Sequence, residues 1–491
     1  MRYDGVQMSL FEVYRDTLEV LESDKPQLFK LLDEHLDWDE IIPFSFYKAF
    51  YKRYGRTRRY SLDSFLKALF LQRIFHYVED AQLLNTLRFS YEMRRYCGFD
   101  KVPDASKITR FKQDFCTHIR DVFEHLVTLT EPVCRKMDKI LADMIVFDTT
   151  GIESYVAENN PKFTEGKLRQ AKAYGKAQSK YSSSGKPSQG FDPHLFRNTL
   201  MPKFAASNPY VKYQYINGHF CYAQKAVIVA NGMGIVRHME LLDDDFKKSH
   251  PELDITKRKG NPELDKELGD SVTLKPVLRD FRSKHPTFTY STFSADAAFD
   301  SYDNYTFLLG EQGFSKAVIP INPRNSSAAK SADFNDQGIP LCPKDKAPFL
   351  FHSKSGGKNR SVRFKFVCPK SKKVYSQPNS TTWRSECANP CTSAIYARCV
   401  YVYPNKNHRL YPGLLRGSDE FAKIYNHRVS VERSIGAFKQ TLGIAGRKTR
   451  NTATTKADLF LVGIVQLLCV LLADKLHNQS LAKSPRKLIA A

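Results

Sequence analysis

Hydrophobic positions in the first part of the chain repeat with the period of an α-helix. After Ser61, apolar side chains recur three and four residues apart: Leu62, Phe65, Leu66, Leu69 and Phe70. That spacing puts them on one helix face, and Ser61 is a typical N-cap residue. Similar spacing continues along this part of the chain until it breaks at residues 102–106. The pattern predicts an all-helical domain over residues 1–138.

A basic helix is predicted directly after that break. It carries Lys107, Arg110 and Lys112. Two helices joined by a short turn, the second with a basic first turn, could form a helix-turn-helix that binds DNA. A helical bundle that only supports the rest of the protein would give the same pattern, so both interpretations stay open.

Between residues 139 and 325 the pattern changes to strands mixed with helices. The apolar run 144–147 predicts a short buried strand that ends at Asp148. β-Branched and aromatic residues predict another strand over 288–293, which leads to Asp296. The Asn231-Gly232 pair between two apolar runs predicts a hairpin. With a helix near 275–283 and a last strand near 318–321, we predict an α/β fold: a mixed sheet with flanking helices.

Residues 161–212 stand out by their charge. They contain ten Lys or Arg and only two acidic residues, Glu165 and Asp192. The run Ser182-Ser183-Ser184-Gly185 in the middle predicts that part of this segment is a flexible loop. A basic loop of this kind suits contact with phosphates, although a solvated linker would have the same composition.

A helix predicted over residues 425–442 has a polar stripe beside its apolar one. At 100° per residue, Tyr425, Arg428, Glu432 and Lys439 fall within about 60° of one another. A carboxylate between two cations and a phenol, at the edge of a buried face, suits a site where a metal ion and phosphates meet. A ladder of surface ion pairs would give the same stripe.

The spacing Tyr425-x2-Arg428-x3-Glu432-x6-Lys439 resembles the Y–R–E–K signature of bacterial insertion-sequence transposases of the DDE class. This resemblance implies an RNase H-like catalytic domain with two further aspartates upstream, each at the end of a strand. Asp148 matches the first position. The helical region before residue 138 is similar to the N-terminal domain of the same group of transposases.

The second aspartate has three candidates. The segment 294–301 resembles the second-aspartate motif of the family, and Asp296, Asp300 and Asp303 all lie in or near it. Asp296 is preferred because it is closest to the predicted strand end, and because the family pattern places the metal ligand before the aromatic-Asp pair. A single aspartate at such a position is also a common helix cap.

The chemistry of phosphodiester cleavage and strand transfer explains these residue types. Two divalent cations can activate the attacking oxygen and stabilise the leaving one. The resemblance implies that Asp148, Asp296 and Glu432 hold Mg²⁺ or Mn²⁺, and hard carboxylate oxygens suit these ions. Arg428 and Lys439 would bind DNA phosphates. Tyr425 would hydrogen-bond a phosphate or simply be a half-buried aromatic at the helix start.

Charge and length agree with a nucleic-acid partner. The 491 residues include 75 Lys or Arg and 52 Asp or Glu, giving a net charge of +23. This charge favours a polyanion but does not by itself distinguish DNA from RNA or an anionic membrane. No secretory signal is apparent, and the longest apolar run, residues 459–472, is short for a bilayer span. We expect a buried helix there, no membrane association, and a cytoplasmic, nucleoid-associated bacterial protein.

Five of the ten cysteines lie in residues 326–415, which interrupt the predicted catalytic domain. A structural Zn²⁺ held by Cys342, Cys368, Cys387 and Cys391 is one hypothesis. Scattered buried thiols in a β-rich insertion are the alternative, because the gaps between these cysteines fit no standard zinc ribbon. Trp383, in the same insertion, is a candidate to hold a base flipped out of DNA.

The predicted domain order follows from these patterns. It is a helical DNA-binding domain (1–138), the first part of the RNase H-like catalytic domain (139–325), the cysteine-containing insertion (326–415), the rest of the catalytic domain with the Glu432 helix (416–475) and a basic tail (476–491).

The function implied is that of a cut-and-paste DNA transposase. It would bind the terminal inverted repeats of its element, cleave them and join them to target DNA, as a homodimer when two ends are synapsed. A domesticated, non-catalytic DNA-binding protein and a nuclease of the same fold that does not join strands are the alternatives.

Overall fold

The computed structural model describes residues 9–23, 25–52, 54–55, 57–181, 184–253, 269–322, 333–335, 337–357, 360–377 and 380–489. The chain forms two compact units, and each is described by itself. The first unit contains Met1–Met137, Gly151–Lys225 and Ile435–Ala491. The second contains Asp138–Thr150 and Ala226–Ser434. Each unit is therefore assembled from separate stretches of the sequence.

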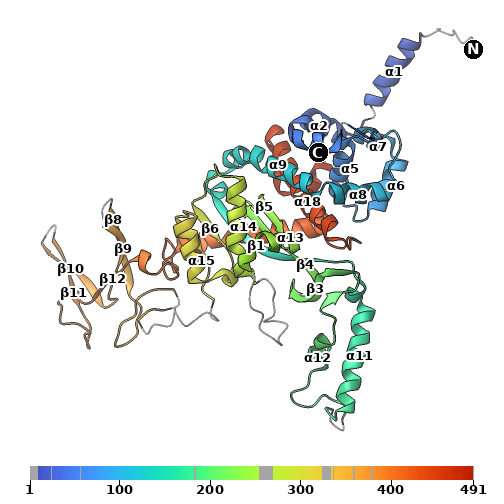
Figure 1. Cartoon of the computed structure of the whole chain (residues 1–491). Helices are drawn as coiled ribbons and strands as arrows, with labels where there is room; N and C mark the ends of the chain where they lie inside the picture. Colours follow the sequence, from blue (N-terminus) through green and yellow to red (C-terminus); the bar gives the residue numbers. More distant parts are fainter. Residues whose placement is uncertain are drawn as a thin grey trace, which may run out of the picture. The chain divides into compact units, whose positions relative to one another are not determined.

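The N-terminal part of the first unit is helical, as predicted (Figure 1). Its helices are α1 (Leu10–Ser23), α2 (Gln27–His35), α3 (Trp38–Ile41), α4 (Phe44–Phe50), α5 (Leu62–Ile74), α6 (Asp80–Phe89), α7 (Tyr91–Cys97), α8 (Ala105–Asp114) and α9 (Cys116–Met137). Ser61 caps α5, since its hydroxyl oxygen accepts a hydrogen bond from the Ser64 N–H at 3.1 Å. The cap predicted from sequence is therefore present.

The core of this helical region is completed by a helix from the far end of the chain. Helix α18 (Thr452–Lys475) packs against α9, α5 and α8, and is followed by α19 (Ser480–Lys483) and a 3₁₀ turn, Pro485–Ile489. By length and composition α18 could cross a membrane, but 89% of its most apolar stretch is buried inside the structure. That burial is typical of the core helix of a globular unit, and residues 459–472 are buried as predicted, except for the partly exposed Leu471.

A buried ionic cluster lies where α5, α6, α8 and α18 meet. Lys112 on α8 contacts Asp80 at 3.0 Å and Asp458 at 3.1 Å. Arg447 contacts the same two carboxylates at 2.7 and 2.8 Å, and Arg73 pairs with Asp458. Burial alone would raise the pKa of Asp458, but the charges of Arg447, Lys112 and Arg73 outweigh it and hold that pKa below its ordinary value. Lys112, one of the three basic residues noted on this helix from the sequence, is fully buried and belongs to the core.

The basic segment 161–212 contains two helices, α11 (Pro161–Ala177) and α12 (Pro193–Thr199), and the loop predicted around residues 182–185 falls between them in the sequence. Its central Ser182 and Ser183 lie outside the described residues. The Tyr174 and Phe196 rings of the two helices stack at 4.5 Å between centroids. A 3₁₀ turn (Ala157–Asn159) precedes α11, and strands β2 (Phe204–Ala205) and β3 (Asn208–Ile216) follow α12. Lys162, Arg169, Lys172 and Lys176 are exposed along α11.

The second unit is built around a mixed sheet with strand order β5-β4-β1-β6-β7 (Figure 1). The strands are β1 (Met144–Glu153), β4 (His219–Asn231), β5 (Val236–Leu241), β6 (Thr292–Ser294) and β7 (Lys316–Val318), of which β1 and β4 continue into the first unit. Strands β1, β6 and β7 run parallel, with Met144 opposite Thr292 and Thr292 opposite Lys316. Strands β4 and β5 form the antiparallel hairpin predicted from Asn231-Gly232. The expectation of an α/β fold with a mixed sheet is thus met.

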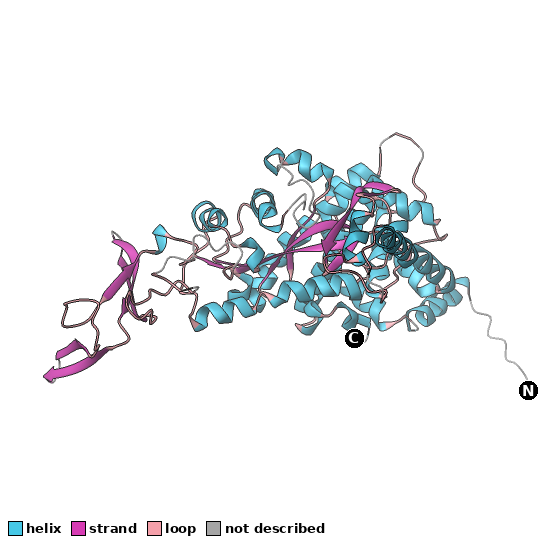
Figure 2. Cartoon of the chain, turned by 90° about the horizontal axis from the view of Figure 1, so that it is seen from below, coloured by secondary structure: helices cyan, strands magenta, loops and turns pink. Residues whose placement is uncertain are grey.

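Helix α14 (Asp270–Lys284) covers one face of this sheet, and its Leu274, Val277, Leu278 and Phe281 join a core with Ile145 and Phe147 of β1. Alternate residues of β1, Met144 and Val146, are buried as well. A strand buried on both faces explains the continuous apolar run in the sequence. The remaining helical pieces are α10 (Lys139–Ala142), α13 (Asp244–Ser249), Pro251–Leu253, Ala297–Phe299, α15 (Tyr302–Thr306), Phe307–Glu311, Pro404–Lys406, α16 (Asp419–Asn426) and α17 (Val429–Gly436). Figure 2 shows the helices of the chain in cyan and its strands in magenta.

Three local predictions need correction. Strand β1 does not end at Asp148 but runs on to Glu153, because Gly151 and Ile152 continue a buried extended segment. Strand β6 is only three residues long. The helix predicted over 425–442 is broken: α16 ends at Asn426, α17 starts at Val429, and Ala437–Thr441 is a π-helical turn. At the first break the bonds tighten to three-residue spacing, with the Arg428 N–H donating to the Tyr425 carbonyl at 2.8 Å.

The insertion forms a β-rich part of the second unit with a small core of its own. Strands β8 (Leu350–Gly357), β9 (Arg360–Val367) and β12 (Cys399–Val402) make one antiparallel sheet, and β10 (Ser371–Gln377) and β11 (Ser380–Ser385) make a separate hairpin. The core consists of buried residues Cys342, Phe349, Phe364, Phe366, Cys368, Ala397, Val402, Leu410 and Tyr411.

Candidate active site

Three carboxylates from three separate elements lie within electrostatic reach of one another in the second unit. Asp148 is on the central strand β1, Asp296 follows the end of the parallel neighbour β6, and Glu432 is in the first turn of α17. Asp296 and Glu432 both raise the pKa of Asp148, and Glu432 raises that of Asp296. Residues nearly 300 positions apart in the sequence therefore contribute to one acidic site.

Asp148 has the most perturbed environment of the three. Burial is the main cause that raises its pKa, to about 7, and the neighbouring carboxylates add to the shift. A hydrogen bond from the Thr149 N–H, at 2.8 Å, and the charge of Arg428 act in the opposite direction. At neutral pH the site is thus under strain from like charges, which a bound cation would relieve.

Asp296 also acts as a local cap. Its carboxylate accepts a hydrogen bond from the Ala298 N–H at 2.9 Å, which opens the 3₁₀ turn Ala297–Phe299. Burial raises its pKa, followed by the charge of Asp270, while the Ala298 N–H and Arg428 lower it. The cap fixes the carboxylate just past the end of β6, so the structural and the electrostatic features coexist in this residue.

The two rival aspartates have other partners. Asp300 is completely buried and bound by Arg409, whose Nη2 lies 2.7 Å from Asp300 Oδ2, and it also accepts from the Asn322 N–H at 2.7 Å. Asp303 is largely exposed and pairs with Lys275. Asp300 thus ties Arg409 of the insertion to the segment after β6, and Asp303 is engaged by Lys275.

Arg428 and Tyr425 line the same site. Arg428 forms an ion pair with Glu432 and lies over the Tyr425 ring, 5.6 Å from its centroid. Burial would lower the pKa of Arg428, but Tyr425, Glu432 and Asp148 together raise it, so the guanidinium remains charged. The break between α16 and α17 keeps these three side chains together although the continuous helix is absent.

Helix α17 is held against the β4–β5 hairpin at one glycine. Gly234 has a φ of +85°, and a Cβ placed there would lie 2.8 Å from the Ser430 carbonyl oxygen and from the Ser434 hydroxyl. The Ser434 hydroxyl donates to the Gly234 carbonyl. Only glycine allows both this backbone conformation and this close approach, which sets where Glu432 stands relative to the sheet.

A fourth carboxylate, Asp270, was missed by sequence reasoning. It is the first residue of α14, accepts a hydrogen bond from the Thr149 hydroxyl at 2.6 Å and raises the pKa of Asp296. An acidic residue at a helix start is too ordinary to stand out in a sequence. Because Asp270 contacts Thr149, the residue that follows Asp148, it is part of this acidic site.

Lys439 lies in the first unit. Its ammonium group donates to Asn217 Oδ1 at 2.8 Å. The same unit holds Glu153, His219 and Cys221, whose potential metal-binding atoms lie within 4.8 Å of one another. His219 Nε2 and Glu153 Oε1 are 3.3 Å apart, and burial raises the pKa of the Cys221 thiol to about 12. A protonated thiol beside an exposed contact between His219 and Glu153 accounts for this cluster.

The donor set around Asp148 fits a hard divalent cation. Asp148, Asp296, Glu432 and Asp270 offer only carboxylate oxygens, the ligand type that Mg²⁺ and Mn²⁺ prefer. Because burial and mutual repulsion disfavour the ionised forms, binding of a cation would gain energy from the same residues that are costly without it.

The metal-free protein should therefore lose stability as the pH rises. A carboxyl pKa raised to about 7 means that folded Asp148 keeps a proton that the unfolded chain has released. Its contribution is full below about pH 4, the unfolded value, and disappears as the pH passes 7, a change of about 4 kcal/mol at most. Urea unfolding with EDTA, followed by hydrogen exchange of β1 and β6, measures this.

Two controls apply to that pH dependence. Asp148→Asn should flatten the profile. At pH 8, Mg²⁺ should raise the stability of the natural protein and should leave that of the variant unchanged. A natural protein whose metal-free stability is constant from pH 5 to pH 8 would show that Asp148 is not strained.

Comparison with known protein families finds a match in the N-terminal part of the chain. Residues 16–114 match the family model described as Transposase domain (DUF772), which covers the helical part of the first unit from α1 to the end of α8. No curated protein matches the chain. The N-terminal helical segment is thus similar to a transposase domain, and this match lies outside the segments that hold the carboxylates.

Proposed function

We propose that the protein is a DNA transposase of an insertion sequence, of the DDE class, with an RNase H-like catalytic domain. The observation that carries the proposal is the acidic site in which Asp148, Asp296 and Glu432 meet from three separate elements, in a chain that also matches a transposase domain. The strand order supports the fold: β1, with the first carboxylate, is central and has β6, with the second, parallel beside it.

The residues of the site have distinct roles in this proposal. Asp148, Asp296 and Glu432 hold Mg²⁺ or Mn²⁺, with Asp270 orienting Thr149 beside them. When bound, these ions would activate the attacking oxygen and stabilise the leaving one. Arg428 orients Glu432 through their ion pair and can offer its remaining N–H donors to a DNA phosphate. Tyr425 supports the guanidinium from below.

Two surfaces supply contacts for double-stranded DNA in this proposal. The exposed lysines and arginine of α11 in the first unit suit a phosphate backbone. In the insertion, a groove of about 820 Å³ combines basic Lys365, Arg384 and Arg398 with aromatic Trp383, Tyr396 and Tyr401. Cations alternating with aromatic rings are typical of surfaces that hold nucleic acid. In the same proposal, Trp383 holds a base flipped out of the DNA. The protein acts as a homodimer when two ends are synapsed.

The test uses DNA that flanks the coding region. A supercoiled plasmid carrying these flanks should be cut at short terminal inverted repeats by the full-length protein with Mg²⁺ or Mn²⁺, and EDTA should abolish cutting. Pre-nicked ends should then be joined to a second plasmid. Cutting without joining would favour a nuclease, and specific binding without cutting would favour a domesticated DNA-binding protein; either result contradicts the proposal.

A further inference from the structure

The small core of the insertion needs more than its apolar side chains. Its nine buried residues include two cysteines, Cys342 and Cys368. A core of this size contributes little stability, and small β-rich units are commonly held together by disulfides or a metal ion. All ten cysteines of the chain are free thiols in this structure. The free thiols of the insertion are therefore candidates to bind a metal ion.

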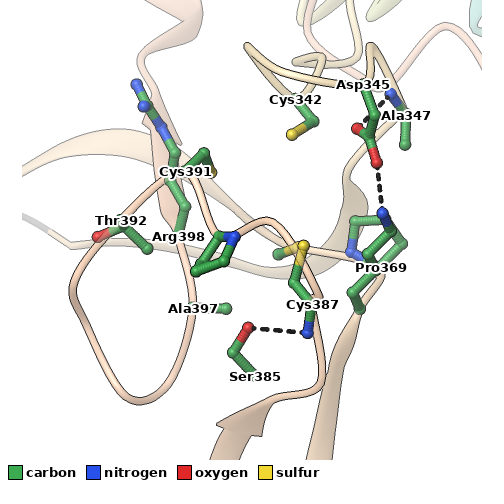
Figure 3. Close-up of a pocket in the computed structure, with 13 residues that line it drawn as sticks. Cys342, Asp345, Ala347, Pro369, Ser385, Cys387, Cys391, Thr392, Ala397 and Arg398 are labelled. Carbon is green, nitrogen blue, oxygen red and sulfur yellow. Dashed lines mark hydrogen bonds and ion pairs between the residues drawn. The ribbon is translucent and has the colours of Figure 1, made fainter.

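Four of the five cysteines in the insertion converge on one pocket. Cys342, Cys368, Cys387 and Cys391 all line it, although they come from three separate segments of the chain. Figure 3 shows Cys342, Cys387 and Cys391 arranged around the same pocket. The fifth cysteine, Cys399, is on β12 and lines the neighbouring basic groove instead. The grouping thus selects the same four residues that sequence spacing suggested.

The backbone holds the first two cysteines in similar tight turns. The Lys346 N–H donates to the Cys342 carbonyl at 2.9 Å, and the Cys342 N–H donates to the Ala347 carbonyl at 2.8 Å. After Cys368, the N–H and the hydroxyl of Ser371 both donate to the Cys368 carbonyl, at 3.1 and 2.6 Å. These hydrogen bonds hold the backbone at Cys342 and at Cys368, two of the four cysteines that line the pocket.

Charged side chains border the pocket. Lys370 and Arg398 line it, and Lys370 is held by an ion pair with Asp345, 2.5 Å between Nζ and Oδ2. The pocket is small: its cavity volume of about 10 Å³ is enough for about one water-sized sphere. It has room for a single ion and none for an organic ligand.

We propose that Cys342, Cys368, Cys387 and Cys391 together bind one structural Zn²⁺. Four sulfur ligands around a single small ion are the composition of a closed, tetrahedral zinc site, with Zn–S distances of about 2.3 Å. Such a site has no open position, so its role is to fasten the loops that carry the cysteines to β9 and β12. The site is independent of the acidic site around Asp148 and of its chemistry.

The metal content of the purified full-length protein tests this directly. Protein prepared under reducing conditions, loaded with excess Zn²⁺ and desalted, should retain about one Zn²⁺ per chain by mass spectrometry. Cys387→Ser alters a half-exposed ligand and should reduce retained zinc at least tenfold. Cys399→Ser is the matched control in the same insertion and should retain zinc like the natural protein. Replacement of Zn²⁺ by Co²⁺ should give the visible absorption of a tetrahedral thiolate site.

Each other result overturns the proposal. A natural protein that retains no zinc has no such site, and equal zinc in the Cys387→Ser variant removes that ligand. Bound iron with sulfide absorption would indicate a cluster instead, and a disulfide between any two of the four cysteines under reducing conditions would exclude zinc. Because these readouts do not involve DNA, failure of the transposase proposal would leave this one standing, and the converse is also true.

Discussion

Asp148→Asn is expected to reduce metal-dependent DNA cleavage at least about 1000-fold, equivalent to about 4 kcal/mol of transition-state stabilisation. Asp148 is at the centre of the site because both Asp296 and Glu432 raise its pKa. It is also the most buried of the three carboxylates. An amide keeps the size of the side chain but loses the charge that would hold a cation. Single-turnover cleavage of end DNA measures the effect, and DNA affinity should change little.

A matched control is available on a neighbouring element. Asp303→Asn makes the same chemical change at an exposed carboxylate of α15 that pairs only with Lys275 among the contacts described, and it should cut at the rate of the natural protein. Asp296→Asn and Glu432→Gln should behave like Asp148→Asn. Cleavage by the Asp148 variant within tenfold of the natural rate would remove this residue from the catalytic site and leave only a basic, DNA-binding protein.

Asp458→Asn is expected to destabilise the first unit by about 3–5 kcal/mol. The substitution leaves Arg73, Lys112 and Arg447 buried with the single carboxylate of Asp80 to compensate them. The side chains of Arg73 and Lys112 are 1% and 0% exposed, so water cannot replace the lost charge. The loss of stability should therefore be larger than for an ion pair at the surface, because the buried cations keep an uncompensated charge.

The two tryptophans allow this effect to be assigned to one unit. Trp38 is buried in the first unit and Trp383 lies in the insertion of the second. In a Trp383→Phe background, urea unfolding followed by fluorescence reports on the surroundings of Trp38 alone. Asp474→Asn, on the same helix α18 but in an exposed pair with Lys136, should change stability by less than about 1 kcal/mol. Equal effects of both substitutions would show that the cluster contributes no more than a surface pair.

Local patterns in the sequence were enough to predict the elements that carry the candidate site. Apolar periodicity located α5 and the buried strand before Asp148, and turn chemistry located the β4–β5 hairpin. These features depend on neighbours within a few residues. The position of Asp296 just after a strand followed from the same kind of local pattern.

The features that the sequence did not reveal depend on distant partners. Lys112 looks like a surface residue of a basic helix until Asp458, far along the chain, is seen beside it. Asp270 acquires meaning only through Thr149. Helices α11 and α12 have no strong apolar stripe. They contact each other through aromatic rings, such as Tyr174 with Phe196, instead of through a continuous buried face. The break at residues 427–428 is likewise compatible with a sequence of helical periodicity.

The dependence of the N-terminal helices on α18 has a consequence for synthesis in the cell. A ribosome adds about 5–20 residues per second, so α9 emerges tens of seconds before the helix that covers it. During that interval the apolar faces of α5, α8 and α9 lack their partner. A nascent chain in this state is a natural client for chaperones, and a fragment that stops before residue 452 is expected to aggregate rather than accumulate as a soluble competitor of the full-length protein.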